Sequence, residues 1–137
     1  MINYTVTTTS SLRNLCIKNN WFTEGSNKQY EKLFYANEHR CPIEEIATII
    51  WLCSDNEWSR RDILFELKDT RIDFWKHVFG IENESAIYKF YSIYDTIFEA
   101  TFKQFVEDAL CSRESEFNYD TVTAIVDCNG YTIWEQE

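Results

Sequence analysis

The chain has 137 residues, of which 45% are hydrophobic and 17% aromatic, and a net charge of −10 at pH 7. A chain of this length can bury roughly two-thirds of its unfolded surface, so one core is expected. The negative charge repels nucleic-acid phosphates and anionic membranes and attracts basic proteins. No stretch approaches the roughly 18 apolar residues of a membrane span, and no signal peptide is recognisable, so we expect a cytoplasmic protein.

The charge is divided unevenly along the chain. Met1–Phe79 hold 10 Lys and Arg against 11 Asp and Glu, a net charge of −1, whereas Gly80–Glu137 hold 3 against 12, a net charge of −9. The electric field near a surface follows the local charge rather than the mean. We therefore expect the second half to attract a partner rich in Lys and Arg.

The first forty residues predict a strand and two helices. The β-branched run Thr5–Thr9 favours a strand, and Ser10 or Ser11 can then cap a helix that ends before Trp21. Ser26 to Gln29 has the pattern of a capping box, which predicts a second helix over 27–38.

Two further helices follow. Pro42 and two glutamates predict a helix over 43–53, and its nearly all-round apolar pattern predicts that it is the most buried. Ser59 begins a fourth helix that ends at Gly80 in a left-handed cap, with a break near Thr70 allowed.

The second half predicts a long helix and a hairpin. Apolar residues recur at spacings of three and four from Glu84 to Leu110 without Gly or Pro, which indicates one helix. Strands over 121–126 and 131–134 flank Asn129-Gly130, the pair that a two-residue type I′ turn requires.

These elements predict an α+β fold class. We expect one mainly helical domain over 1–137, with about five helices and a small antiparallel sheet from the hairpin 121–135, to which the N-terminal strand could add. Within it, residues 10–79 form a near-neutral helical half and residues 80–137 an acidic half.

The segment 43–68 resembles a helix-turn-helix unit. In such a unit Arg60 and Arg61 begin the recognition helix, where bases and phosphates are reached. Trp51 stands where the tight turn usually has glycine, and carboxylates at Asp55, Glu57 and Asp62 surround the arginines. A DNA-binding regulator, acting as a dimer, is therefore the alternative function.

The acidic half supplies the main candidate surface. Asp95 and Glu99 are spaced one turn apart on the expected long helix, and a solvated face that keeps the protein soluble is the competing interpretation. A tryptophan with an exposed ring would add an interface anchor. The predicted partner-binding residues are Asp95, Glu99, Glu107, Asp108, Glu114, Glu116, Asp120 and Trp134.

Cysteines and histidines predict no catalytic or metal site. The five cysteines are odd in number and form no Cys-x-x-Cys pair, so we expect reduced, mostly buried thiols and no zinc. The nearest thiol and imidazole, Cys41 and His39, do not face each other naturally. We expect no metal, no cofactor and no enzymatic activity.

The first half also carries a family resemblance. Asn20-Trp21-Phe22-Thr23-x-Gly25-Ser26 and Glu44-Glu45-Ile46-Ala47-Thr48-Ile49-Ile50-Trp51 resemble small proteins of bacteriophages and mobile elements of Gram-positive bacteria, over about residues 10–68. In size and charge the chain is similar to acidic anti-CRISPR and antirestriction inhibitors.

The resemblance and the charge together give the main functional expectation. The protein would act in a bacterial host as a DNA mimic that occupies the basic nucleic-acid groove of a defence protein, by analogy a CRISPR-associated nuclease. It would contact neither nucleic acid nor membrane directly. Whether it is a monomer or a homodimer stays open.

Overall fold

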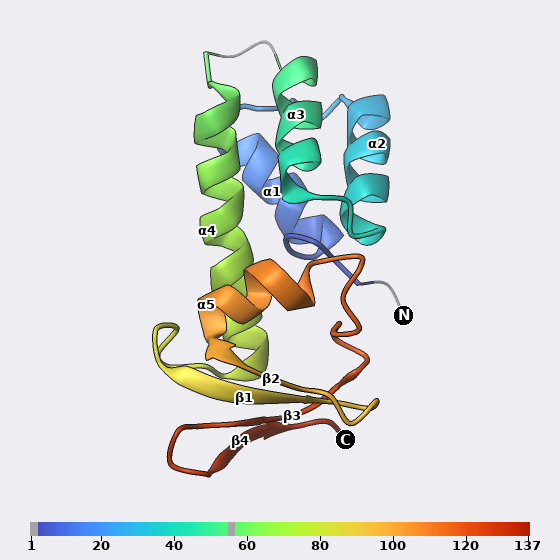
Figure 1. The fold of residues 1–137 in the computed structure, drawn as a ribbon. Coiled ribbons are helices and arrows are strands. Elements are labelled where there is room, and N and C mark those ends of the chain that lie inside the picture. The colour runs from blue at the N-terminus through green and yellow to red at the C-terminus, as the bar shows by residue number, and fades with distance from the viewer. Residues whose placement is uncertain (1–2, 55–56) are drawn as a thin grey trace. The chain divides into compact units, whose positions relative to one another are not determined.

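The computed structural model describes residues 3–54 and 57–137 (Figure 1). It confirms the α+β class, with helices and a small antiparallel sheet whose strand order is β2-β1-β3-β4. The elements are α1 (Thr9–Lys18), α2 (Asn27–Glu38), α3 (Ile43–Cys53), α4 (Arg60–Phe79), β1 (Ile87–Ser92), β2 (Ile97–Thr101), α5 (Phe102–Phe105), the π-helix η1 (Val106–Leu110), β3 (Val122–Val126) and β4 (Thr132–Glu135).

The chain forms two compact units, which we call the helical unit (Ile2–Arg71) and the sheet unit (Ile72–Glu137). Each has its own cluster of buried apolar side chains, and α4 contributes residues to both clusters. Within 3–54 and 57–137, no helix is both long and apolar enough to cross a bilayer.

The expected strand Thr5–Thr9 is wrong, because one side chain bonds that backbone in place of a neighbouring strand. Buried Asn37 on α2 accepts a hydrogen bond from the Val6 N–H through Oδ1 at 2.8 Å and donates from Nδ2 to the Thr7 carbonyl at 2.7 Å. Its own carbonyl accepts from the Thr5 N–H at 2.9 Å. Because Asn37 bonds these backbone N–H and C=O groups, residues 5–7 form a bend and not a strand, and α1 begins at Thr9.

Two predicted caps also differ. Thr8 caps α1, since its side chain accepts from the Ser11 N–H at 3.3 Å, so neither Ser10 nor Ser11 is the cap. The capping box before α2 does not form, because the Ser26 hydroxyl pairs with the Thr23 hydroxyl at 3.0 Å. The bounds predicted for α2 and α3 are nevertheless confirmed.

The burial of α3 differs from the prediction, whereas both predicted ends of α4 are confirmed. Leu52 on α3 is 69% exposed and Trp51 is also exposed, so α3 is not buried all round. Ser59 caps α4 by accepting from the Asp62 N–H at 3.1 Å, and Gly80 follows with φ 65°. The helix between them is unbroken, so no break occurs near Thr70.

The long helix predicted over Glu84–Leu110 is wrong except at its end. Residues 87–101 form the antiparallel hairpin of β1 and β2, and only 102–110 are helical. This stretch is rich in aromatic and β-branched residues, which fit a half-buried pleated surface. Its apolar spacing also suits a strand, since Tyr88, Phe90 and Ser92 alternate onto one buried face.

The β1–β2 turn reverses the chain without glycine. Asp95 takes φ 61°, a left-handed conformation that Asp tolerates better than most residues. The Ser92 hydroxyl accepts from the N–H groups of Tyr94 and Thr96 at 3.1 and 3.3 Å, and the Ser92 carbonyl accepts from the Asp95 N–H. These bonds fix the tight turn.

The C-terminal hairpin is confirmed, but its turn is not a two-residue type I′ turn. Gly130 has φ 87° whereas Asn129 has no positive φ, and a type I′ turn needs both. The Asp127 N–H donates to the Tyr131 carbonyl at 2.9 Å, which leaves three residues in the loop. The Asp127 carboxylate accepts from the N–H groups of Asn129 and Tyr131 at 2.9 Å each.

One face of the sheet forms the core of its unit. Phe90 and Phe105 stack with ring centroids 3.7 Å apart, and both are fully buried. Phe105 also contacts Phe98 on β2. The helical stretch 102–110 therefore covers this face of the sheet, while the other face carries the exposed side chains of Ile87 and Ile97.

Phe90→Ala should destabilise the protein by about 3–5 kcal/mol, because it removes a fully buried ring from the centre of the stack. Tyr94→Ala is the matched control, since that ring is 61% exposed, and it should change stability by less than about 0.5 kcal/mol. Urea unfolding followed by circular dichroism measures both. Similar losses in the two variants would contradict this packing.

Asp95→Val should lower the free energy of unfolding by about 1–2 kcal/mol, because a β-branched residue is strained at φ 61°. Asp95→Asn removes the charge but keeps the left-handed tolerance and should be nearly neutral. If urea midpoints show Val tolerated as well as Asn, the turn is not left-handed there.

Candidate partner-binding surfaces

Four of the predicted partner-binding residues lie in one short segment of the sheet unit, which we call the acidic segment (107–116). Val106, Ala109 and Leu110 bury one side of η1, so Glu107 and Asp108 are exposed on the other. The loop that follows is held by buried Cys111 and Phe117, and it leaves exposed Glu114 and Glu116. Exposed Arg113 in the same loop offsets part of this charge.

The remaining predicted carboxylates lie elsewhere, so the expected helical stripe is wrong. Asp95 sits in the β1–β2 turn, and Glu99 lies on β2 opposite Lys89. Asp120 precedes β3, and its carbonyl accepts from the Gln136 side chain at 2.9 Å. A hairpin separates residues that a helix would have stacked one turn apart.

Trp134 is half-buried and its ring has partners inside the sheet unit. It meets Phe79 edge-on at 4.8 Å and lies 6.3 Å from Tyr119. Trp134 also pairs with Ile125 across β3 and β4, on the covered face of the sheet. It therefore contributes to the core, and its use as a contact for a partner stays a prediction.

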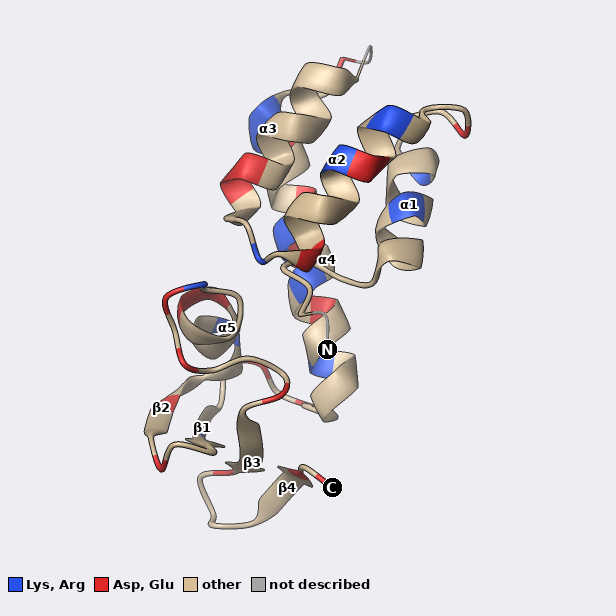
Figure 2. Cartoon of the chain, turned by 90° about the vertical axis from the view of Figure 1, so that its right-hand side faces the viewer, with Lys and Arg blue, Asp and Glu red and all other residues tan. Residues whose placement is uncertain are grey.

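The division of charge follows the two units (Figure 2). The sheet unit holds 4 Lys and Arg against 13 Asp and Glu, a net charge of −9, and the helical unit holds 9 against 10, a net charge of −1. Lys76 Nζ lies 3.9 Å from Glu84 Oε2, so this lysine forms an ion pair within the sheet unit. Because Lys76 is paired with Glu84, the acidic segment and the carboxylates of the sheet keep a strong local excess of negative charge.

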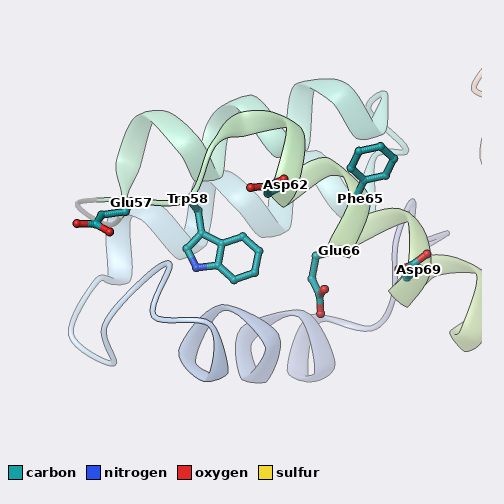
Figure 3. Close-up of a pocket in the computed structure, with 6 residues that line it drawn as sticks. All are labelled: Glu57, Trp58, Asp62, Phe65, Glu66 and Asp69. Carbon is teal, nitrogen blue, oxygen red and sulfur yellow. The ribbon is translucent and has the colours of Figure 1, made fainter.

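The helical unit contains an acidic hollow that the sequence analysis missed (Figure 3). It has a volume of about 540 Å³ and is shallow and open. In Figure 3 the Trp58 ring and the Glu66 carboxylate extend to the same side of α4, and Trp58 meets Trp21 edge-on at 5.3 Å. The lining residues are Glu57, Trp58, Asp62, Phe65, Glu66 and Asp69.

A sequence signal for this hollow does exist. Asp62, Glu66 and Asp69 are spaced by four and three residues, which places them on one helix face beside Phe65. Carboxylates around aromatic rings attract the ammonium and guanidinium groups of lysine and arginine. The Arg61 guanidinium already lies 5.5 Å from the centre of the Phe65 ring.

This charge bears directly on the helix-turn-helix hypothesis. Arg60 and Arg61 are the first two residues of α4 and are exposed, as that hypothesis requires. The acidic hollow lies beside them, however, and carboxylates repel the phosphates that a DNA-binding helix must approach. Residues 54–59 separate α3 from α4, and Asp55 lies outside the described residues.

Among the described residues, the thiol and imidazole that lie nearest in the sequence are placed differently. Cys41 is buried, while the His39 ring stacks on Tyr35 at 4.0 Å with Nδ1 2.8 Å from the Tyr35 carbonyl. Among the residues that the structure describes, no group of three or more His, Cys, Asp or Glu could hold a metal ion. Burial raises the pKa of Cys16 to about 12, so this thiol stays protonated.

Comparison of the chain with protein-family models, curated proteins and solved structures found no significant match. The resemblance to phage proteins therefore stays a prediction. What the chain does has to be inferred from its charge and geometry.

The Cys16 thiol gives a pH-dependent prediction. An unfolded thiol ionises near pH 9, whereas the native thiol keeps its proton until about pH 12, so stability should fall as pH rises between these values. The slope from Cys16 is at most about 1.4 kcal/mol per pH unit. Urea unfolding at about pH 8 and about pH 10.5 should show a shallower decline for Cys16→Ala than for the native chain. An unchanged slope would refute the assignment.

Proposed function

We propose that this protein is a non-enzymatic inhibitor that binds the basic nucleic-acid groove of a bacterial defence protein. The observation that supports this proposal best is the net charge of −9 on the sheet unit, against −1 on the helical unit. A groove that holds nucleic acid is lined with Lys and Arg that neutralise phosphates. A surface rich in exposed carboxylates competes for the same side chains.

The acidic segment suits this role because its backbone is fixed while its carboxylates are exposed. Buried Val106 and Phe117 anchor its two ends in the core, so little ordering is needed on binding. Charges of this kind steer the encounter and set the register of a complex. The resemblance to phage proteins directs the proposal to a CRISPR-associated nuclease as the target.

A DNA-binding regulator is less well supported, because the acidic hollow lies beside Arg60 and Arg61. A gel shift against the DNA upstream of its own gene separates the two functions. A sequence-specific shift that is lost in Arg60→Ala/Arg61→Ala would favour the regulator and contradict the inhibitor.

Inhibition can be measured with a panel of purified CRISPR-associated nucleases, each loaded with guide RNA. We expect the protein to reduce target-DNA binding by one of them, and this effect should weaken steeply with salt because the contacts are ionic. Glu107→Lys/Asp108→Lys should lower the affinity at least about tenfold, which is about 1.4 kcal/mol. Both positions are exposed, so the variant should fold.

The matched control is Glu24→Lys/Glu31→Lys, which makes the same change in net charge at exposed positions of the helical unit. It should leave most of the inhibition intact. Equal losses in the two double variants would show that only net charge matters. No inhibition of any nuclease in the panel, or inhibition that is insensitive to salt, would contradict the proposal.

A further inference from the structure

The sheet has two outer strands, β2 and β4, and they differ in how they are protected. β4 has four residues, and its pairing with β3 is interrupted by a register shift between Ile125 and Val126. β2 has five residues in uninterrupted register with β1, and like β4 it contains neither Pro nor Lys. Short strands, bulges, Pro and Lys are the usual devices that block edge pairing. β2 is therefore the less protected edge.

The register identifies which backbone groups of β2 face this edge. The Ser92 N–H donates to the Thr96 carbonyl at 3.0 Å, so these two residues form a hydrogen-bonded pair of the antiparallel ladder. Such pairs alternate along the ladder, which makes Phe90 and Phe98 the next one. Ile97 and Glu99 belong to the alternating pairs that are not hydrogen-bonded to β1. Their backbone N–H and C=O groups therefore point away from β1. Within 3–54 and 57–137, no backbone hydrogen bond is described for these groups.

The open face of the sheet continues from this edge. Ile97 is 54% exposed, and a hollow of about 550 Å³ extends from Glu99 across β1 to the β3–β4 turn at Asp127. Ile87, Tyr91 and Val126 give this hollow an apolar floor. A strand added beside β2 would place alternate side chains on the same face as Ile97 and Glu99.

Charge selects the occupant of this edge. Each copy of the chain has a net charge of −10, with −9 on the sheet unit itself, so two copies repel each other here. Glu99 and Asp127 border the hollow, and Lys89 is the one basic residue among those that line it. An extended segment with a Lys or Arg and an apolar residue two positions apart places both side chains on this face and matches both the charge and the floor.

We propose that the free edge of β2 takes up such a basic, extended segment of the partner as a fifth strand of the sheet. This mode of recognition draws affinity from main-chain hydrogen bonds and specificity from alternate side chains. The inference rests on the proposed function for the identity of the partner. The edge itself can be tested without that partner.

The probe is a capped (Lys-Thr-Val-Thr)₂ peptide, which presents Lys and Val on one face of a strand, titrated to millimolar concentration into the ¹⁵N-labelled full chain. We expect the amide signals of Ile97 and Glu99 to shift and their hydrogen exchange to slow. A counterpart that is N-methylated at every backbone nitrogen keeps the charge and side chains but has no backbone N–H groups, and it should produce neither effect. Equal effects from both peptides, or shifts confined to Glu107 and Asp108, would overturn the inference.

Two variants at one position separate the backbone from the side chain. Ile97→Pro removes the outward N–H, which a strand edge tolerates, whereas Ile97→Ala keeps it. The proline variant should bind the peptide about tenfold more weakly than the alanine variant. Its two-dimensional NMR spectrum checks that the sheet is intact. Equal peptide affinities would contradict strand addition.

The outcomes distinguish the two proposals. Inhibition of a nuclease without peptide binding at Ile97 and Glu99 would remove the edge and keep the inhibitor. Peptide binding at the edge without inhibition of any nuclease would keep the edge and remove the inhibitor.

Discussion

The turn between Ser92 and Thr96 is the constraint on which the sheet unit depends. It reverses the chain by placing Asp95 at φ 61° and by directing two backbone N–H groups onto the Ser92 hydroxyl. Because the chain turns there, Phe90 and Phe98 come side by side, and Phe105 can pack across both. The exposed edge of β2 is a product of the same reversal. Without it the unit would have neither its core nor its open face.

Local signals predicted α2, α3 and α4 well and the first hairpin not at all. The bounds of α2 follow from the capping pattern at Ser26, although that capping box does not form, and those of α3 follow from Pro42 and the apolar residues after it. Asn129-Gly130 reveals the second hairpin. The two turns are built alike, since Asp127 and Gly130 do what Ser92 and Asp95 do. Gly130 makes the second turn recognisable in the sequence. In the first turn Asp95 takes the left-handed conformation, and the sequence gives no comparable signal. Apolar residues at spacings of three and four then suited a helix as well as a strand.

The candidate surface was predicted in charge but not in geometry. Counting residues locates the acidic half, and the structure places nearly the same excess in one compact unit. The position and exposure of each predicted partner-binding side chain depend on which side of its helix or strand is buried. Glu107 and Asp108 are exposed as expected. Glu99 lies on a strand in place of the predicted helix, and the Trp134 ring packs against Phe79 in the core. The hollow beside Trp58 was missed because the acidic residues of the first half are balanced by nearby cations in any count.

The π-helical turn η1 has a consequence for how such a protein can diversify. A π-helical turn holds one residue more than an α-helical one, and insertions of this kind recur at functional sites. Because the extra residue is absorbed within one widened turn, deleting it would restore regular α-helical winding and leave the chain after it in nearly the same direction. The direction of the loop that carries Glu114 and Glu116 therefore does not depend on this residue. A lineage could gain or lose one residue beside Glu107 and Asp108, and so change the exposed charge there, while β3 and β4 stayed in place.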